Sequence, residues 1–153
     1  MRHARTPTRL ETVDYRQDRT YAVTFCVARR RPVFANPLFA SVAVECLRHF
    51  RQSELYYLYA YAVMFDHVHM VLRVIKPRVH LSKVIAVVRS CITSKVRRSI
   101  AHFAWQRGYY ERIVRNADEC RETVEYVLAN PRRANLVKDR EQYAFSGILD
   151  RWR

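Results

Sequence analysis

Two alternating segments joined by only two residues constrain the fold of this chain more than any other feature. Residues 55–64 (LYYLYAYAVM) and 67–75 (HVHMVLRVI) are rich in β-forming residues, and their side chains alternate in character. A period of two is typical of β-strands, whose successive side chains point to opposite faces. A link as short as 65–66 permits only a tight turn, so the two segments predict an antiparallel hairpin. Its first strand should carry three tyrosines on one face: Tyr57, Tyr59 and Tyr61.

The sequence on both sides of this hairpin predicts a layered α+β domain. Further strands are expected over 20–30 and 108–114, and helices over 36–54, 81–100 and 116–130. Asn36 before Pro37 is a typical helix start, and Pro131 should end the last helix, because the residue before proline disfavours helical geometry. The order β-α-β-β-α-β-α predicts an antiparallel sheet with packed helices, close to the ferredoxin-like pattern. Residues 1–19 should form a flexible basic arm, and residues 20–153 a single domain.

The charge of the chain points to a polyanionic partner. Lys and Arg number 28 against 14 Asp and Glu, a net charge of +14, and solubility does not require this excess. The four cysteines form no CxxC pair, which favours reduced thiols and a cytoplasmic location. The sequence shows neither an apolar leader nor a segment apolar enough for a membrane span, so we expect no membrane partner.

Two histidines in the second strand form the first candidate site. His67 and His69 should share one face, opposite Val68, Met70 and Leu72. Their Cα atoms would lie about 6–7 Å apart, so both imidazoles could reach one metal ion. Such a pair is only half of a site, because Mg²⁺ or Mn²⁺ needs further ligands, usually oxygens. The alternative is a pair of neighbouring histidines that only pack into the core.

A second candidate pair lies in the last predicted helix. Tyr126 and Asn130 are four residues apart and therefore lie on one helix face. If that face packs on the histidine side of the sheet, the phenol could attack a DNA phosphodiester beside a metal held by imidazoles and an amide oxygen. The alternatives are a half-buried tyrosine and an ordinary helix-end asparagine, and Tyr110 is a second candidate nucleophile.

The ordered motifs resemble those of the single-tyrosine HUH transposases, and more closely the REP-associated tyrosine transposases. The motifs are HVH at 67–69, WQ at 105–106, IVRN at 113–116 and VEYVLANP at 124–131. The resemblance covers about residues 20–137.

This resemblance implies a metal-dependent enzyme that cleaves and rejoins single-stranded DNA through a 5′-phosphotyrosine. It implies that Tyr126 is the nucleophile and that His67, His69 and Asn130 bind Mg²⁺ or Mn²⁺. It further implies a single-stranded or hairpin DNA substrate. We expect a monomer or a homodimer, and the sequence does not distinguish the two. Some relatives have Gln or an acidic residue as the third ligand, and Asn has a shorter reach than Gln.

Basic residues spread along the chain are the candidates for contacts with DNA phosphates. The predicted DNA-binding residues are Arg89, Lys95, Arg97, Arg98, Arg107, Arg112, Arg115, Arg132 and Arg133, with Arg2, Arg5 and Arg9 in the arm. For any single arginine the alternative is a solvated surface charge. Two other functions stay open: a domesticated protein that binds hairpin DNA without cutting it, and a small basic RNA-binding domain, which would expose aromatic residues on its central strands.

Overall fold

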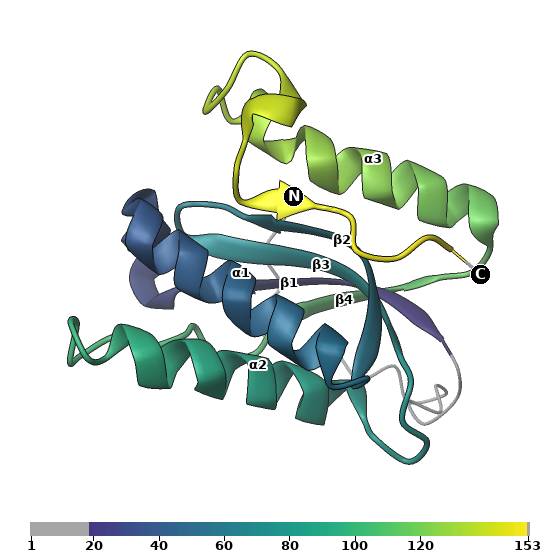
Figure 1. Ribbon diagram of the computed structural model, residues 1–153, viewed down its shortest axis with the longest axis horizontal. Coiled ribbons are helices and arrows are strands. Elements are labelled where there is room, and N and C mark those ends of the chain that lie inside the picture. The colour runs from purple at the N-terminus through teal and green to yellow at the C-terminus, as the bar shows by residue number, and fades with distance from the viewer. Residues whose placement is uncertain (1–18, 153) are drawn as a thin grey trace.

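A five-stranded antiparallel sheet forms the middle layer of the molecule (Figure 1). The structure is a computed structural model that describes residues 19–152, so nearly all of the predicted arm lies outside the described residues. The strands run in the order β4-β1-β3-β2-β5. They are β1 (Thr20–Cys26), β2 (Tyr56–Val63), β3 (His67–Val74), β4 (Tyr110–Val114) and β5 (Ser146–Gly147).

Helices cover both faces of this sheet (Figure 1). The helices α1 (Pro37–Gln52) and α2 (Leu81–Val96) bury the main core on one face, and α3 (Ala117–Arg133) covers the other. Three short 3₁₀ helices lie in the loops: η1 (Ala28–Arg30), η2 (Val33–Ala35) and η3 (Arg140–Gln142). The predicted α+β, ferredoxin-like architecture is confirmed. No helix within residues 19–152 is long and apolar enough to cross a bilayer.

The predicted hairpin is present, and β3 divides its side chains between the two layers as expected. Val68, Met70 and Leu72 are fully buried in the main core under α1 and α2. Val71 joins the smaller core under α3, and His69 faces the same way and is 7% exposed. Both histidines of β3 therefore lie on the α3 face of the sheet.

The alternation predicted for β2 is wrong at its third tyrosine. The register between β2 and β3 shifts between Leu58 and Ala60, as a β-bulge does. An extra residue moves every later side chain to the opposite face. Tyr59 packs in the core under α3, on the same side as Tyr57, whereas Tyr61 consequently packs in the core under α1 and α2.

The predicted end of the last helix is also wrong, because α3 continues through Pro131 to Arg133. A proline inside a helix loses one backbone hydrogen bond but does not have to end it. Here Pro131 is buried, and the backbone N–H of Leu136 donates to its carbonyl at 2.9 Å. The extra turn brings Arg133 back beside the ring of Tyr126.

Two further differences concern segments with weak sequence signals. The first strand ends at Cys26 instead of residue 30, because Arg29 and Arg30 turn away in a left-handed conformation. The C-terminal segment, for which the sequence predicted no strand, contributes β5 on the outer edge of β2. Asn36 does cap α1 as expected, and its side chain accepts a hydrogen bond from the Leu38 N–H.

Candidate active site

A pocket of about 380 Å³ opens between α3 and the sheet. The structure brings together in it all four residues on which the predicted chemistry rests: His67, His69, Tyr126 and Asn130. Thr24 and Tyr110 line it as well. The sheet register explains this, because Thr24 is opposite His69 on one side and Tyr110 on the other, so the three share the α3 face.

The two histidines of β3 turn the same ring nitrogen toward each other. Their Nε2 atoms are 3.0 Å apart, and their rings are perpendicular with centroids 4.7 Å apart. The other ring nitrogens have partners in the protein. Nδ1 of His67 is 2.6 Å from Oδ1 of Asp66, and Nδ1 of His69 is 2.8 Å from Oγ1 of Thr24. These contacts orient both rings and leave the Nε2 atoms directed into the pocket.

The electrostatics of the pocket keep His69 neutral. Burial, together with the nearby positive charges of His67, Arg133 and Arg30, lowers the pKa of His69 to about 3. Asp66 behaves differently: burial alone would raise its pKa, but hydrogen bonds from His67 and Arg30 outweigh burial and lower it. Arg30 donates from Nε to Oδ2 of Asp66 at 2.9 Å. The result is an ionised carboxylate that holds His67 and a neutral imidazole at His69.

The spacing of the two histidines fits a shared divalent ion. Ligands at right angles around an ion, each about 2.1 Å from it, lie about 3.0 Å apart, and the Nε2 atoms are 3.0 Å apart. Among residues 19–152, no group of three His, Cys, Asp or Glu side chains is arranged to hold a metal. Asn130 has an amide oxygen in the same pocket, a group that could join the two imidazoles in a ligand set. A mixed imidazole and oxygen set suits Mn²⁺ and related ions.

One guanidinium organises the α3 side of the pocket. Arg133 stacks on the ring of Tyr126, with Cζ 3.8 Å from the ring centroid. Its Nη2 also donates to Oδ1 of Asn130 at 2.7 Å and to the Tyr126 carbonyl at 3.1 Å. Within residues 19–152, Nδ2 of Asn130 is buried and has no hydrogen-bond partner. Tyr126 is 43% exposed, so a large substrate can reach it.

Comparison with known proteins identifies the family. Residues 16–130 match the model of the family described as "Transposase IS200 like". The chain belongs to the IS200-like transposases. Its fold is similar to that of a REP-associated tyrosine transposase solved bound to a REP hairpin, with a TM-score of 0.72 and 19% identity over 89% of this chain and 81% of that one.

A second solved structure with a similar fold is a putative transposase from Deinococcus radiodurans R1. Its TM-score is 0.55 and its identity 17%, over 78% of this chain and 95% of that one. No curated protein matches this IS200-like transposase significantly. The family match thus identifies the chain as a transposase, and the two structures support the fold alone.

The predicted DNA-binding residues of this transposase fall into two groups, one at or near β4 and α3 and the other on α2 or just after it. Arg112 and Arg133 lie at the pocket, where Arg112 donates to Oγ1 of Thr123 at 2.7 Å. Arg107, Arg115 and Arg132 are exposed in the loops before β4 and α3 and at the end of α3. The residues of the second group belong to α2 or follow it, in the layer opposite the pocket: Arg89, Lys95, Arg97 and Arg98. Their contacts with DNA stay predictions.

Arg89 has structural contacts that sequence patterns could not reveal. Its guanidinium lies 5.3 Å from the ring centroid of Phe25 and 5.8 Å from those of Trp105 and Tyr109. It also donates to the carbonyl of Gly108, which has a positive φ of 78°. Burial lowers its pKa. Arg89 therefore holds the turn before β4, and binding a phosphate would require it to leave these contacts.

Sequence analysis missed Thr24 and Arg30, which line the pocket, and Asp66, which contacts His67 behind it. Asp66 directly precedes the HVH motif, so its place in the sequence next to His67 could have identified it. Thr24 and Arg30 could not be found in this way, because their places depend on the pairing of β1 with β3 and on the turn after β1.

Proposed function

We propose that this transposase cleaves and rejoins single-stranded DNA through a covalent bond between Tyr126 and a 5′-phosphate. The observation that supports the proposal is the shared pocket, which places an accessible phenol on α3 across from a paired, oriented set of imidazoles on β3. A protein that only binds DNA needs neither group. The pocket therefore favours a nucleolytic over a purely binding role.

In the proposed reaction the phenolic oxygen of Tyr126 bonds to the scissile phosphorus. The bond from phosphorus to the 3′ oxygen breaks, and a free 3′-hydroxyl leaves with the proton that the phenol gives up. Attack by a 3′-hydroxyl on the phosphotyrosine reverses these steps and rejoins the strand without an external energy source. The guanidinium of Arg133 over the Tyr126 ring favours the negative charge that develops on the phenol oxygen.

His67, His69 and Asn130 are the proposed ligands of Mg²⁺ or Mn²⁺. When bound, the ion would polarise the scissile phosphate and offset the charge that accumulates on its oxygens. Asp66 and Thr24 contact the Nδ1 atoms of the two imidazoles, whose Nε2 atoms lie 3.0 Å apart. Oδ1 of Asn130 accepts a bond from Arg133, and the second lone pair of this amide oxygen could coordinate the ion.

The proposed substrate is single-stranded DNA next to a hairpin. The similar REP-associated transposase was solved with a REP hairpin, and the net charge of +14 favours a polyanion. We place the reaction in the cytoplasm, where the free thiols of the chain stay reduced.

The test is a covalent adduct on a denaturing gel. The protein is incubated with Mn²⁺ and a labelled pool of single-stranded DNA hairpins whose flanks are randomised. The wild type and the matched Tyr110→Phe variant should form a labelled protein–DNA band, and Tyr126→Phe should form none. Replacing His67 or His69 by Ala should remove the band, as should EDTA.

Two outcomes would change the assignment. A band that persists in Tyr126→Phe and disappears in Tyr110→Phe would identify Tyr110, on β4, as the nucleophile. Hairpin binding without an adduct under any metal condition would instead support a protein that binds DNA without cutting it.

A further inference from the structure

A second hollow, of about 400 Å³, lies outside the catalytic pocket. It forms between the turn at residues 27–33 and the loop at residues 100–104. Arg29, Arg31 and His102 are exposed on its wall, and Val27 and Phe103 form a buried apolar floor. The hollow thus combines concentrated positive charge with an apolar surface, a combination that proteins use to bind unpaired nucleotides.

The turn that carries these arginines connects the two pockets. Arg30 extends into the catalytic pocket and binds Asp66, while its neighbours Arg29 and Arg31 line the second hollow. Arg29 and Arg30 have positive φ values of 57° and 54°. Residues other than glycine rarely adopt this conformation, and such strain gathers at functional sites. Here the strained turn directs consecutive arginines into two different pockets.

The hollow is held in shape by backbone contacts between its two sides. The N–H of Ala28 donates to the carbonyl of Ala104 at 3.0 Å, and Val27 pairs with Trp105 in an isolated β-bridge. Nε of Arg97 also donates to the carbonyl of Phe103 at 2.9 Å. A ligand therefore meets a largely preformed surface, which reduces the entropy lost on binding.

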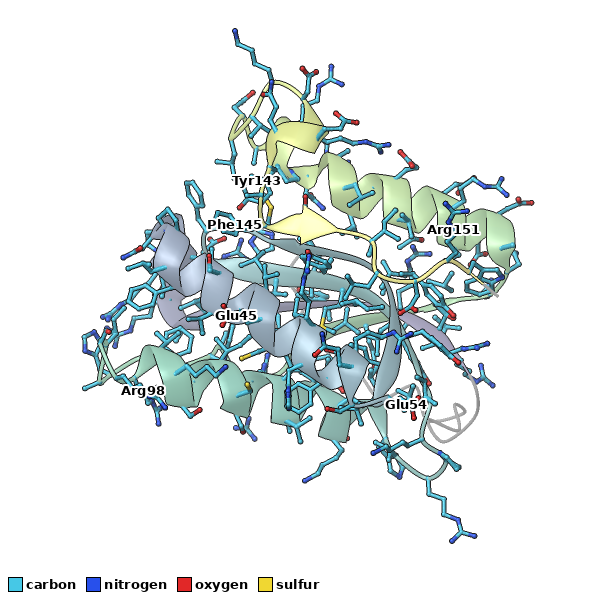
Figure 2. The ribbon with its side chains drawn as sticks, viewed as in Figure 1. Glu45, Glu54, Arg98, Tyr143, Phe145 and Arg151 are labelled. Atoms are coloured by element: carbon cyan, nitrogen blue, oxygen red, sulfur yellow. The ribbon has the colours of Figure 1, made fainter. Side chains whose placement is uncertain are left out.

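More positive charge surrounds the same end of the molecule. Arg97 and Arg98 follow the end of α2, beside the loop that forms one wall, and both are exposed. Figure 2 shows Arg98 at the end of α2. Two of the predicted DNA-binding residues, Arg97 and Arg98, therefore lie near this hollow.

We propose that the hollow binds one nucleotide of the single-stranded DNA that flanks the scissile phosphate. Arg29 and Arg31 would hold its phosphates, and its base would pack on the apolar floor. DNA of the substrate is the favoured occupant because the arginine turn is continuous with the catalytic pocket, so one strand can contact both. This inference rests on the proposed function and adds to it a specific contact with the flanking strand.

Binding measurements in EDTA test the inference apart from cleavage. All proteins carry Tyr126→Phe, and fluorescence anisotropy follows two labelled probes: a blunt DNA hairpin and the same hairpin with single-stranded arms. Arg29→Glu with Arg31→Glu should weaken binding of the armed hairpin at least tenfold and that of the blunt hairpin less than twofold. The matched control, Arg78→Glu with Lys83→Glu, changes the charge equally at the other end of α2 and should weaken both probes less than threefold.

Equal losses on both probes, or the same loss in the control, would show a general charge effect and overturn the proposal. A second measurement needs no substitution in the hollow. Photo-crosslinking of 4-thiothymidine in the arms should attach DNA to peptides that contain residues 27–33 or 100–104, and crosslinks confined to other peptides would also overturn it. If the gel assay gives an adduct but the binding and crosslinking results oppose a role for the hollow, only the proposal for the hollow is rejected. If the protein binds no hairpin, both proposals are rejected.

Discussion

Arg133 lies against the ring of Tyr126, with its Cζ atom 3.8 Å from the ring centroid. The same guanidinium donates to Oδ1 of Asn130 at 2.7 Å. One positive charge thus contacts both the proposed nucleophile and the proposed third metal ligand. The contact exists only because α3 continues one turn past Asn130, through a buried proline.

Replacing Arg133 by Ala should therefore affect metal binding and chemistry in opposite directions. The loss of a nearby positive charge and the release of Asn130 should tighten Mn²⁺ binding about threefold to tenfold. The loss of the stacked guanidinium, which orients and stabilises the phenolate, should slow adduct formation at least tenfold. Electron paramagnetic resonance of free Mn²⁺ measures the first effect, and quantified gel bands measure the second.

Arg132→Ala is the matched control, because Arg132 is a neighbouring exposed arginine on the same turn. It should leave Mn²⁺ affinity unchanged within twofold and weaken DNA binding mainly at higher salt. Weaker Mn²⁺ binding in Arg133→Ala would show that Arg133 supports the metal site and does not compete with it.

The contacts behind the two histidines should matter for metal affinity. In Asp66→Asn the carboxylate that holds Nδ1 of His67 is lost, and in Thr24→Val the hydroxyl beside Nδ1 of His69 is lost. Partners of this kind typically contribute 10–100-fold in metal affinity. Mn²⁺ titrations should show a loss in this range for Asp66→Asn and a smaller loss for Thr24→Val. Thr20→Val, a buried change on the same strand and face, should have no effect, and equal losses in all three would indicate general damage to β1 and its neighbours.

The lowered pKa of His69 should appear in the stability of the metal-free protein. Its folded pKa of about 3 lies below the ordinary value of 6.5, so on acidification the unfolded chain takes up this proton first. The contribution of His69 to the free energy of unfolding is therefore fully present above about pH 7 and is lost as the pH falls from about 6.5 toward 3. Between pH 7 and pH 5 the loss should be about 2 kcal/mol.

Urea unfolding in EDTA at pH 7 and pH 5 measures this loss. His69→Gln keeps a polar side chain that does not titrate, so its free energy of unfolding should fall by about 2 kcal/mol less than that of the wild type over the same interval. Identical pH dependence in both proteins would mean that His69 titrates normally in the folded state.

The features of the fold that sequence could predict are those with local causes. The faces of β3 follow from the alternation of Val68, Met70 and Leu72 with the histidines, which burial against α1 and α2 enforces. The start of α1 follows from Asn36, whose side chain caps it. The bulge in β2 has no local signal, and the residues beside it are distant in sequence: the N–H groups of Leu149 and Asp150 donate to the carbonyl of Leu58. Continuation of α3 likewise depends on burial of Pro131.

The candidate site divides in the same way. Residue spacing predicted that His67 and His69 share a strand face and that Tyr126 and Asn130 share a helix face. That the two faces meet in one pocket was implied only by the resemblance to known transposases. The supporting contacts of Thr24 and Arg30 could not be anticipated, because strand register and a left-handed turn determine them. The contact of Arg133 with both α3 residues depended on a helix turn that the proline rule had excluded.

The most destabilising single change we predict lies far from the site, at Asp150. Its carboxylate accepts bonds from Nε and Nη2 of Arg51 at 2.5 and 2.7 Å, and its Oδ2 accepts the N–H of Leu58 at 2.8 Å beside the bulge of β2. Asp150 is 9% exposed, so Asp150→Ala leaves the partly exposed Arg51 guanidinium and the buried N–H of Leu58 without their acceptor. The free energy of unfolding in urea should fall by about 3 kcal/mol. Asp118→Ala, which breaks the exposed pair with Arg121, is the control and should cost less than about 1 kcal/mol; similar losses in the two variants would mean that the C-terminal segment does not anchor β2.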